Sequence, residues 1–271
     1  MPNNIFIDKE DKRPIGIFDS GLGGLTVLND LALSFPSQRF IYLGDLANLP
    51  YGNKSEDNII KCSLRCANFL KEQNVKGIVI ACNTASSYAY SQIKENIKIP
   101  IFDVVSPCAE SVSESKYKKI AIIGTEKTIE SNIYHNTIKS LNKNIQIYNI
   151  ACPLFVPIVE EGLENSNIAK SAIDMYLNKL KMLNIEGLVL GCTHYPMLSE
   201  ALEKYFNNSI TIFRSGEALA RKYKNRADCS YLEPLTLVEI EYYVTDSPTR
   251  FIKYGNKFLF QKIYNAKLVK L

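Results

Sequence analysis

Short apolar runs alternate with longer amphipathic stretches along almost the whole chain, and this alternation constrains the fold more than any other feature. Residues 15–18, 40–43 and 77–81 are almost continuous runs of aliphatic and aromatic side chains, and stretches with helical spacing, such as 25–33 and 58–72, separate them. Strands that are apolar at every position are typical of a parallel sheet buried on both faces. The pattern therefore predicts a doubly wound α/β protein.

The same alternation continues in the second half of the chain, where strands are predicted at 119–123, 145–150, 187–190 and 210–213. A length of 271 residues is enough for one large domain or two of ordinary size. With 46% hydrophobic and 22% charged residues, the composition is that of a globular protein and argues against a disordered chain or a coiled coil.

Two similar segments of the sequence indicate that the chain has two comparable halves. Residues 77–84 read Gly-Ile-Val-Ile-Ala-Cys-Asn-Thr, and residues 187–194 read Gly-Leu-Val-Leu-Gly-Cys-Thr-His. Each segment is a predicted strand followed by a cysteine and two polar residues, and Cys192 lies 110 residues after Cys82. That separation leaves room for one small α/β unit per copy. We therefore expect two pseudo-symmetric units, each with a mainly parallel sheet flanked by helices.

Both cysteines are predicted at the carboxyl ends of parallel strands, where open α/β sheets bind ligands. The residues that follow them, Asn83-Thr84 and Thr193-His194, are suited to beginning a helix. A helix N-terminus carries partial positive charge, so it lowers the pKa of a cysteine and binds anions. We expect each cysteine to be a reactive thiolate beside a carboxylate-binding loop; the alternative is a pair of inert, buried thiols.

Two matched thiols suit the removal of a proton from one face of a carbon and its delivery to the other face, which inverts a stereocentre. A nucleophilic cysteine enzyme needs one cysteine with a base and has no use for a second. A redox pair usually follows a CxxC spacing, which neither site shows. Zinc would need more ligands than the chain places nearby, since His135 and His194 are its only histidines.

Other features exclude several classes of protein. A formal charge of +4 gives no reason to expect nucleic acid as a partner, and no apolar stretch is long enough to cross a membrane. The start of the chain has no apolar signal region, and the seven cysteines are an odd number, so we expect a reduced, cytoplasmic protein. Gly21, Gly23 and Gly24 resemble a dinucleotide fingerprint, but Thr26 occupies its third glycine position.

Several motifs occur in a fixed order between about residue 15 and residue 259. They are Asp19-Ser20-Gly21-Leu22-Gly23-Gly24, Gly44-Asp45 with Pro50-Tyr51-Gly52, Ala81-Cys82-Asn83-Thr84, Cys152-Pro153 with Glu160, Gly191-Cys192-Thr193-His194-Tyr195-Pro196, and Tyr243-Val244-Thr245-Asp246. Together they resemble the glutamate racemases of the aspartate/glutamate racemase superfamily. The resemblance implies catalysis without pyridoxal phosphate, metal or any other cofactor.

The resemblance also implies roles for individual residues. Cys82 would take the α-proton from D-glutamate, and Cys192 would take it from L-glutamate. Asp19 would assist near Cys82, while His194 and Glu160 would assist on the side of Cys192. The substrate-binding residues that it implies are Asp19, Ser20, Tyr51, Gly52, Asn83, Thr84, Thr193, His194 and Thr128.

Each of these residues also has a purely structural alternative. Asp19 and Ser20 could cap the first helix, and Thr84 could cap its own. The segment Pro50-Tyr51-Gly52 could be only a turn. His194 could be a hydrogen-bonded core histidine, and Glu160 a solvated helical acid. In the last part of the chain, six Lys or Arg follow Asp246 with apolar residues between them, which we interpret as the solvated face of a C-terminal element packed on the first domain.

The resemblance further implies a discontinuous first domain, 1–103 plus 215–271, and a second domain, 104–214, with the active site between them. It implies a homodimer that supplies D-glutamate for bacterial peptidoglycan. The chain departs from the family pattern at Arg214, where Asp is usual, at Cys108, where Gly is usual, and over Leu46–Leu49, which lacks a common Arg. The alternatives are a racemase of aspartate or another small acid, a non-catalytic binding protein, and a cysteine-based redox or metal protein.

Overall fold

The computed structural model describes residues 5–6, 10–224 and 237–271, so Cys229 lies outside the described residues. Its strands form two sheets, and the strands within each sheet pair in parallel. The first sheet contains β1 (Ile15–Asp19), β2 (Phe40–Gly44), β3 (Gly77–Ile80), β4 (Ile101–Asp103), β9 (Ile240–Val244) and β10 (Lys267–Leu268). The second contains β5 (Lys119–Gly124), β6 (Gln146–Ala151), β7 (Gly187–Gly191) and β8 (Thr211–Arg214). The predicted α/β fold is confirmed.

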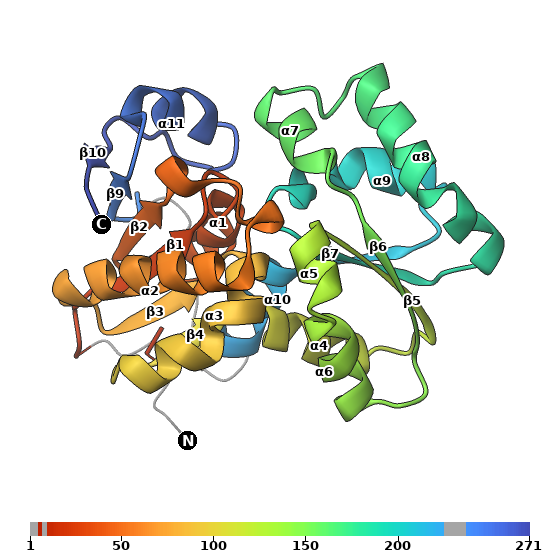
Figure 1. Ribbon diagram of the computed structural model, residues 1–271, viewed down its shortest axis with the longest axis horizontal. Coiled ribbons are helices and arrows are strands. Elements are labelled where there is room, and N and C mark those ends of the chain that lie inside the picture. The colour runs from red at the N-terminus through yellow and green to blue at the C-terminus, as the bar shows by residue number, and fades with distance from the viewer. Residues whose placement is uncertain (1–4, 7–9, 225–236) are drawn as a thin grey trace.

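The strand orders of the two sheets repeat one another. The first sheet has the order β10-β9-β2-β1-β3-β4, and the second has the order β6-β5-β7-β8. Four adjacent strands at one end of the first sheet, β2-β1-β3-β4, therefore correspond one by one to the second sheet: β1 to β5, β2 to β6, β3 to β7 and β4 to β8. This repetition confirms the pseudo-symmetry that the similar segments 77–84 and 187–194 predicted. The sheets lie beside each other in Figure 1, the first in red to yellow with its blue C-terminal strands and the second in green to cyan. The domain boundaries at 103/104 and 214/215 remain a prediction.

Helices connect the strands and cover the sheets (Figure 1). In the first part of the chain they are α1 (Leu25–Ser34), α2 (Glu56–Glu72), α3 (Asn83–Asn96) and α4 (Val105–Ser113), with 3₁₀ helices η1 (Leu46–Asn48) and η2 (Tyr51–Asn53). They continue with α5 (Glu126–Glu130), α6 (Ile133–Leu141), α7 (Phe155–Glu160), α8 (Asn167–Leu183), η3 (Tyr195–Leu198), α9 (Ser199–Tyr205), α10 (Ser215–Lys224) and α11 (Pro248–Gly255). Across the described ranges, no helix combines the length and apolar character needed to span a membrane.

Burial explains the apolar runs of the sequence. Every residue of β1, β2, β3 and β7 is buried, as expected for strands covered on both faces. Helix α2 turns one face towards the first sheet, and Cys62, Cys66 and Leu70 lie on that face. A Cβ at Gly16 would lie 3.1 Å from Leu70, so glycine on β1 allows the helix to approach closely. Cys62 and Cys66 are thus part of the core of the first unit.

The C-terminal segment completes the first sheet. Strand β9 pairs with β2, and β10 pairs with β9. Helix α11 places Phe251 on Tyr42 of β2, with 5.9 Å between the ring centroids. The predicted packing of the C-terminal residues on the first unit is confirmed, and it brings α11 beside the space between the two sheets (Figure 1).

Candidate active site

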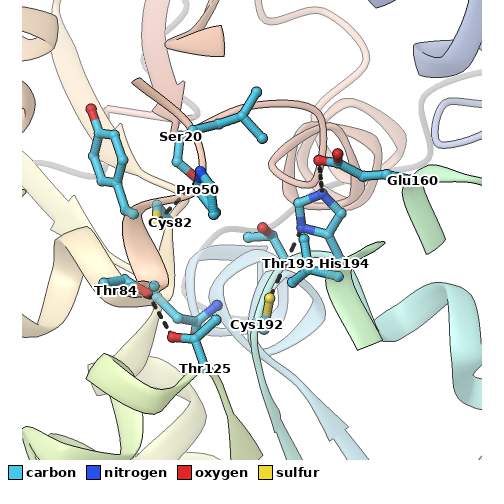
Figure 2. Close-up of a pocket in the computed structure, with 14 residues that line it drawn as sticks. Ser20, Pro50, Cys82, Thr84, Thr125, Glu160, Cys192, Thr193 and His194 are labelled. Atoms are coloured by element: carbon cyan, nitrogen blue, oxygen red, sulfur yellow. Dashed lines mark hydrogen bonds and ion pairs between the residues drawn. The ribbon is translucent and has the colours of Figure 1, made fainter. Parts of the chain in front are cut away.

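Both cysteines line one small cavity between the two sheets. The cavity has room for about one water-sized sphere, roughly 20 Å³. Its lining consists of Ser20, Leu49, Pro50, Tyr51, Gly52, Cys82, Asn83, Thr84, Thr125, Val156, Glu160, Cys192, Thr193 and His194. Figure 2 shows the side chains of Cys82 and Cys192 approaching from different elements, Cys82 after β3 and Cys192 after the corresponding strand β7. Of the predicted site residues, Asp19 and Thr128 lie outside this lining and contact it from behind.

Cys82 begins helix α3. It is the N-cap residue, and its Sγ accepts a hydrogen bond from the backbone N–H of Ala85 at 3.4 Å. This corrects the expectation that Asn83 or Thr84 would cap the helix. The Cys82 thiol also donates to Ser20 Oγ, at 3.8 Å, across the end of β1.

The expected lowering of the Cys82 pKa is wrong for this structure. Burial and, to a smaller extent, the nearby Asp19 carboxylate raise the pKa of Cys82 to about 12, and the Ala85 N–H and Ser20 only partly oppose them. Only 5% of Cys82 is exposed. Loss of solvation therefore outweighs the helix N-terminus, and the thiol is neutral at pH 7.

Cys192 lies at one end of a chain of polar groups. Its Sγ is 4.0 Å from His194 Nδ1, and His194 Nε2 is 3.2 Å from Glu160 Oε1 (Figure 2). Burial opposes a charge on His194, but its contacts with Cys192 and Glu160 raise its pKa to about 10. His194 is therefore a cation at neutral pH. Burial alone would raise the pKa of Glu160, yet the hydrogen bond from His194 and the charge of Arg250 lower it.

Asp19 connects the two halves of the site. It is fully buried at the end of β1 and accepts hydrogen bonds from the Gly21 N–H at 2.9 Å and from Thr193 Oγ1 at 3.2 Å. Burial raises its pKa, and the His194 cation partly offsets this. Because Thr193 follows Cys192, the Asp19 carboxyl group of the first unit contacts the cysteine loop of the second.

Asn83 offers an unused hydrogen-bond donor to the cavity. Its Oδ1 accepts from the Tyr134 hydroxyl at 2.5 Å, which fixes the orientation of the amide. Its Nδ2 is buried and has no partner within the part of the chain that the structure describes. Buried donors are nearly always hydrogen-bonded, so this one is free to donate to a ligand oxygen.

Three threonine hydroxyls meet between the units. Thr84 Oγ1 is 3.0 Å from Thr125 Oγ1 and 3.1 Å from Thr128 Oγ1, and the latter two are 3.0 Å apart. Thr125 is not among the site residues predicted from the sequence. The signal for it is positional, because Thr125 follows β5 just as Ser20 follows the corresponding strand β1.

Tyr51 and Gly52 form the wall opposite Thr125. The Tyr51 hydroxyl donates to Asp45 Oδ2 at 2.6 Å, so its polar end points into the first unit. A Cβ at Gly52 would lie 2.6 Å from Thr125 Cβ, which shows how closely the two units approach there. In the described ranges, no three His, Cys, Asp or Glu side chains group in a way that could hold a metal ion.

Comparison with known proteins gives one consistent assignment. The Asp/Glu/Hydantoin racemase family matches residues 28–223. The chain is 40% identical to the glutamate racemase of Thermoanaerobacter pseudethanolicus over 260 residues, which cover 94% of this chain and 97% of that one. It is 51% identical to the glutamate racemase of Sulfurihydrogenibium sp. over 214 residues, or 78% of this chain and 82% of the other.

A solved structure supports the same assignment. The crystal structure of glutamate racemase from Francisella tularensis in complex with D-glutamate has a TM-score of 0.85 and 35% identity, covering 96% of this chain and 98% of that chain. The predicted resemblance is confirmed. The chain belongs to the Asp/Glu/Hydantoin racemase family and is an amino-acid racemase.

Proposed function

We propose that this protein interconverts L- and D-glutamate by proton transfer between two cysteines. The observation that carries the proposal is that Cys82 and Cys192, which follow corresponding strands of the two sheets, line the same cavity. A substrate between them would expose opposite faces of its α-carbon to the two sulfur atoms. The names of the relatives support glutamate as the amino acid.

The proposed reaction begins with one cysteine as thiolate and the other as thiol. With D-glutamate, the Cys82 thiolate removes the α-proton, and the Cys192 thiol gives its proton to the opposite face of the resulting carbanion. The product is L-glutamate, and the charges of the two cysteines have been exchanged. The reverse reaction uses the same groups in the opposite order, so no proton is gained or lost in a cycle.

The surrounding residues prepare this chemistry in different ways on the two sides. On the Cys192 side, the His194 cation supplies a positive charge 4.0 Å from the sulfur. On the Cys82 side the thiol is neutral without ligand. There we propose that the substrate ammonium supplies the missing positive charge, which acidifies the thiol and the α-carbon together. Asn83 Nδ2, Ser20 and the threonine hydroxyls are the proposed donors to the carboxylates, and Asp19 the proposed partner of the ammonium.

The direct test is incubation with L-glutamate in deuterated water, with no cofactor and with a chelator present. We expect D-glutamate that carries deuterium at the α-carbon, detected by loss of the α-proton NMR signal and by chiral chromatography. L-Aspartate is the comparison substrate, and inversion of aspartate at a higher rate would favour the alternative racemase. Binding of glutamate without α-proton exchange would make the protein a binding module and contradict the proposal.

We also propose, from the resemblance noted in the sequence, that the enzyme works in the cytoplasm as a homodimer and supplies D-glutamate for peptidoglycan. Rescue of a bacterial strain that requires D-glutamate would support the biosynthetic role. Sedimentation velocity would report the oligomeric state, and a monomer at micromolar concentration would contradict the dimer.

A further inference from the structure

The C-terminal helix of the first unit contacts the Cys192 side of the site. Arg250 of α11 extends towards α7 in the second unit, where its Nη2 lies 3.6 Å from Glu160 Oε2. Phe258, just after α11, places its ring edge-on to His194, with centroids 6.1 Å apart and an interplanar angle of 87°. Lys257 lies against Gly162, which has a φ of 72° just beyond the end of α7. Figure 1 shows α11 and α7 facing each other at the same edge of the molecule.

Glu160 is held at both oxygens. Oε1 lies against His194 and Oε2 against Arg250, and the Glu160 side chain is only 10% exposed. Arg250 is 49% exposed, so it can be changed without opening the core. A buried carboxylate with two cationic partners has one preferred orientation, whereas one with a single partner can rotate away from it.

The chain of contacts from Cys192 through His194 and Glu160 to Arg250 supports the Cys192 side of the site. The groups that contact the Cys82 thiol are Ser20 and the N–H of Ala85, both from the first unit to which Cys82 itself belongs. The groups behind Cys192 come from three elements: the loop after β7, helix α7 and, through Arg250, helix α11. We propose that Arg250 is a positioning residue that holds the Glu160 carboxylate against His194 and thereby supports the acid–base group Cys192. The inference rests on the proposed function, since it assigns Arg250 to one of the two proposed proton-transfer sites.

The histidine content of the chain makes a direct test possible. His194 and His135 are the only histidines, so nitrogen NMR of the rings gives two pairs of signals, which a His135→Asn variant assigns. The charged and titratable groups around His194 are Cys192, Glu160 and Asp19, with Arg250 behind Glu160. We expect Arg250→Gln to lower the pKa of His194 by roughly half a pH unit, because Glu160 is no longer held in place. Arg250→Lys should restore most of it.

The other outcomes each contradict the proposal. A rise in the pKa of His194 would mean that Arg250 acts only as a distant positive charge, because removing that charge makes it easier to protonate His194. An unchanged pKa would mean that Arg250 and His194 are not coupled. Lys253→Gln is the matched control, because it removes the same charge from an exposed position on α11 while Lys253 contacts the ring of Tyr254 at 5.1 Å. It should leave the pKa of His194 unchanged.

Kinetics provide a second readout. The two enantiomers have equal free energies in water, so kcat/KM must fall by the same factor in both directions. For Arg250→Gln we expect that factor to be about two to five. A role on one side should divide the loss between kcat and KM differently for L- and D-glutamate, and an identical division would contradict it. Because the NMR measurement needs no turnover, failure of the proposed function and failure of this inference are distinguishable.

Discussion

At Cys82 two opposing effects act on the same sulfur atom. The helix N-terminus and the Ala85 N–H favour a thiolate, while burial and the Asp19 carboxylate favour the thiol, and the second pair prevails. Cys192 has instead a histidine cation within 4.0 Å. The two thiols occupy corresponding positions in the fold but different electrostatic environments, so the environment of each residue decides its chemistry.

Replacing either cysteine by serine tests the proposed proton transfer. A hydroxyl group is too weak an acid to carry the proton at neutral pH, so we expect Cys82→Ser and Cys192→Ser each to lower racemisation by about a thousandfold. Circular dichroism of glutamate measures the rate in both directions. Cys62→Ser, a buried cysteine on α2, is the control and should keep most of the activity. Near-normal turnover of either site variant would contradict the two-cysteine mechanism.

Asp30 provides a pH-dependent prediction for stability. Burial and the neighbouring Glu217 raise its pKa to about 7, with Arg214 partly opposing them. The folded state therefore holds this proton more tightly than the unfolded chain does. Its stabilising effect is complete below about pH 4 and is lost as the pH rises through 7.

Asp30→Asn does not titrate at this position. We expect its free energy of unfolding to exceed that of the wild type at pH 8 by about 2–4 kcal/mol, and by much less at pH 4.5. Urea denaturation at both pH values measures the difference. Asp57→Asn, on the exposed first turn of α2, controls for the loss of one charge. The same stability difference at both pH values for Asp30→Asn would contradict the assignment.

At the scale of elements, the loop after β1 approaches the loop after β7 closely at Gly23, which has no side chain. The Thr26 hydroxyl donates to the Thr193 carbonyl at 2.9 Å, and a Cβ at Gly23 would overlap Thr193 Oγ1 and His194 Nδ1. Glycine at this position therefore allows the first unit to support the Cys192 loop.

Gly23→Ala should push His194 out of position. We expect a loss of about a hundredfold in kcat/KM, because a displacement of about 1 Å has an effect of that size on aligned groups. The matched control is Gly21→Ala in the same loop, where the nearest contact of an added Cβ would be 3.8 Å, and it should retain most of the activity. Equal effects of the two substitutions would show that the close approach at Gly23 does not matter.

The elements also show what a sequence can predict. The continuous apolar runs predicted β3 and β7, each followed by a cysteine, because a strand that is buried at every position has an unbroken run of apolar residues. The structure begins η3 after His194 instead of an α-helix, and η3 leads directly into α9. Hydrophobic spacing over four residues cannot distinguish the two forms. Thr125 was missed because its position beside the site depends on the strand order of both sheets. The predicted lowering of the Cys82 pKa was wrong because the burial of Cys82 depends on the packing of segments that are distant in the sequence.

At the scale of the whole molecule, the space between the units is too small for the proposed substrate. A cavity of roughly 20 Å³ holds about one water molecule, whereas glutamate has ten non-hydrogen atoms. The contacts that close it are the threonine hydroxyls and the approach of Gly52 to Thr125. We therefore expect the two units to separate when an amino acid enters.

Hydrogen exchange tests this opening. The amides of residues 84–86 and 125–128 lie where the units meet, and they should exchange through the open form. We expect saturating D-glutamate to slow their exchange at least several-fold, because a ligand that binds the closed form stabilises it. Amides in the centres of β1 and β5 provide the internal comparison and should change little. Identical exchange at the meeting surface with and without glutamate would contradict an opening linked to binding.

The repeated strand order has a consequence for handedness. The two copies of this α/β unit place one cysteine each, Cys82 and Cys192, at the same cavity, so a carbon between them has a sulfur atom on either side. The repeat therefore places a sulfur atom on each side of a ligand, whichever mirror image is bound. The two sides differ in the residues in which the copies have diverged, such as Ser20 on one side and the pair Glu160 and His194 on the other.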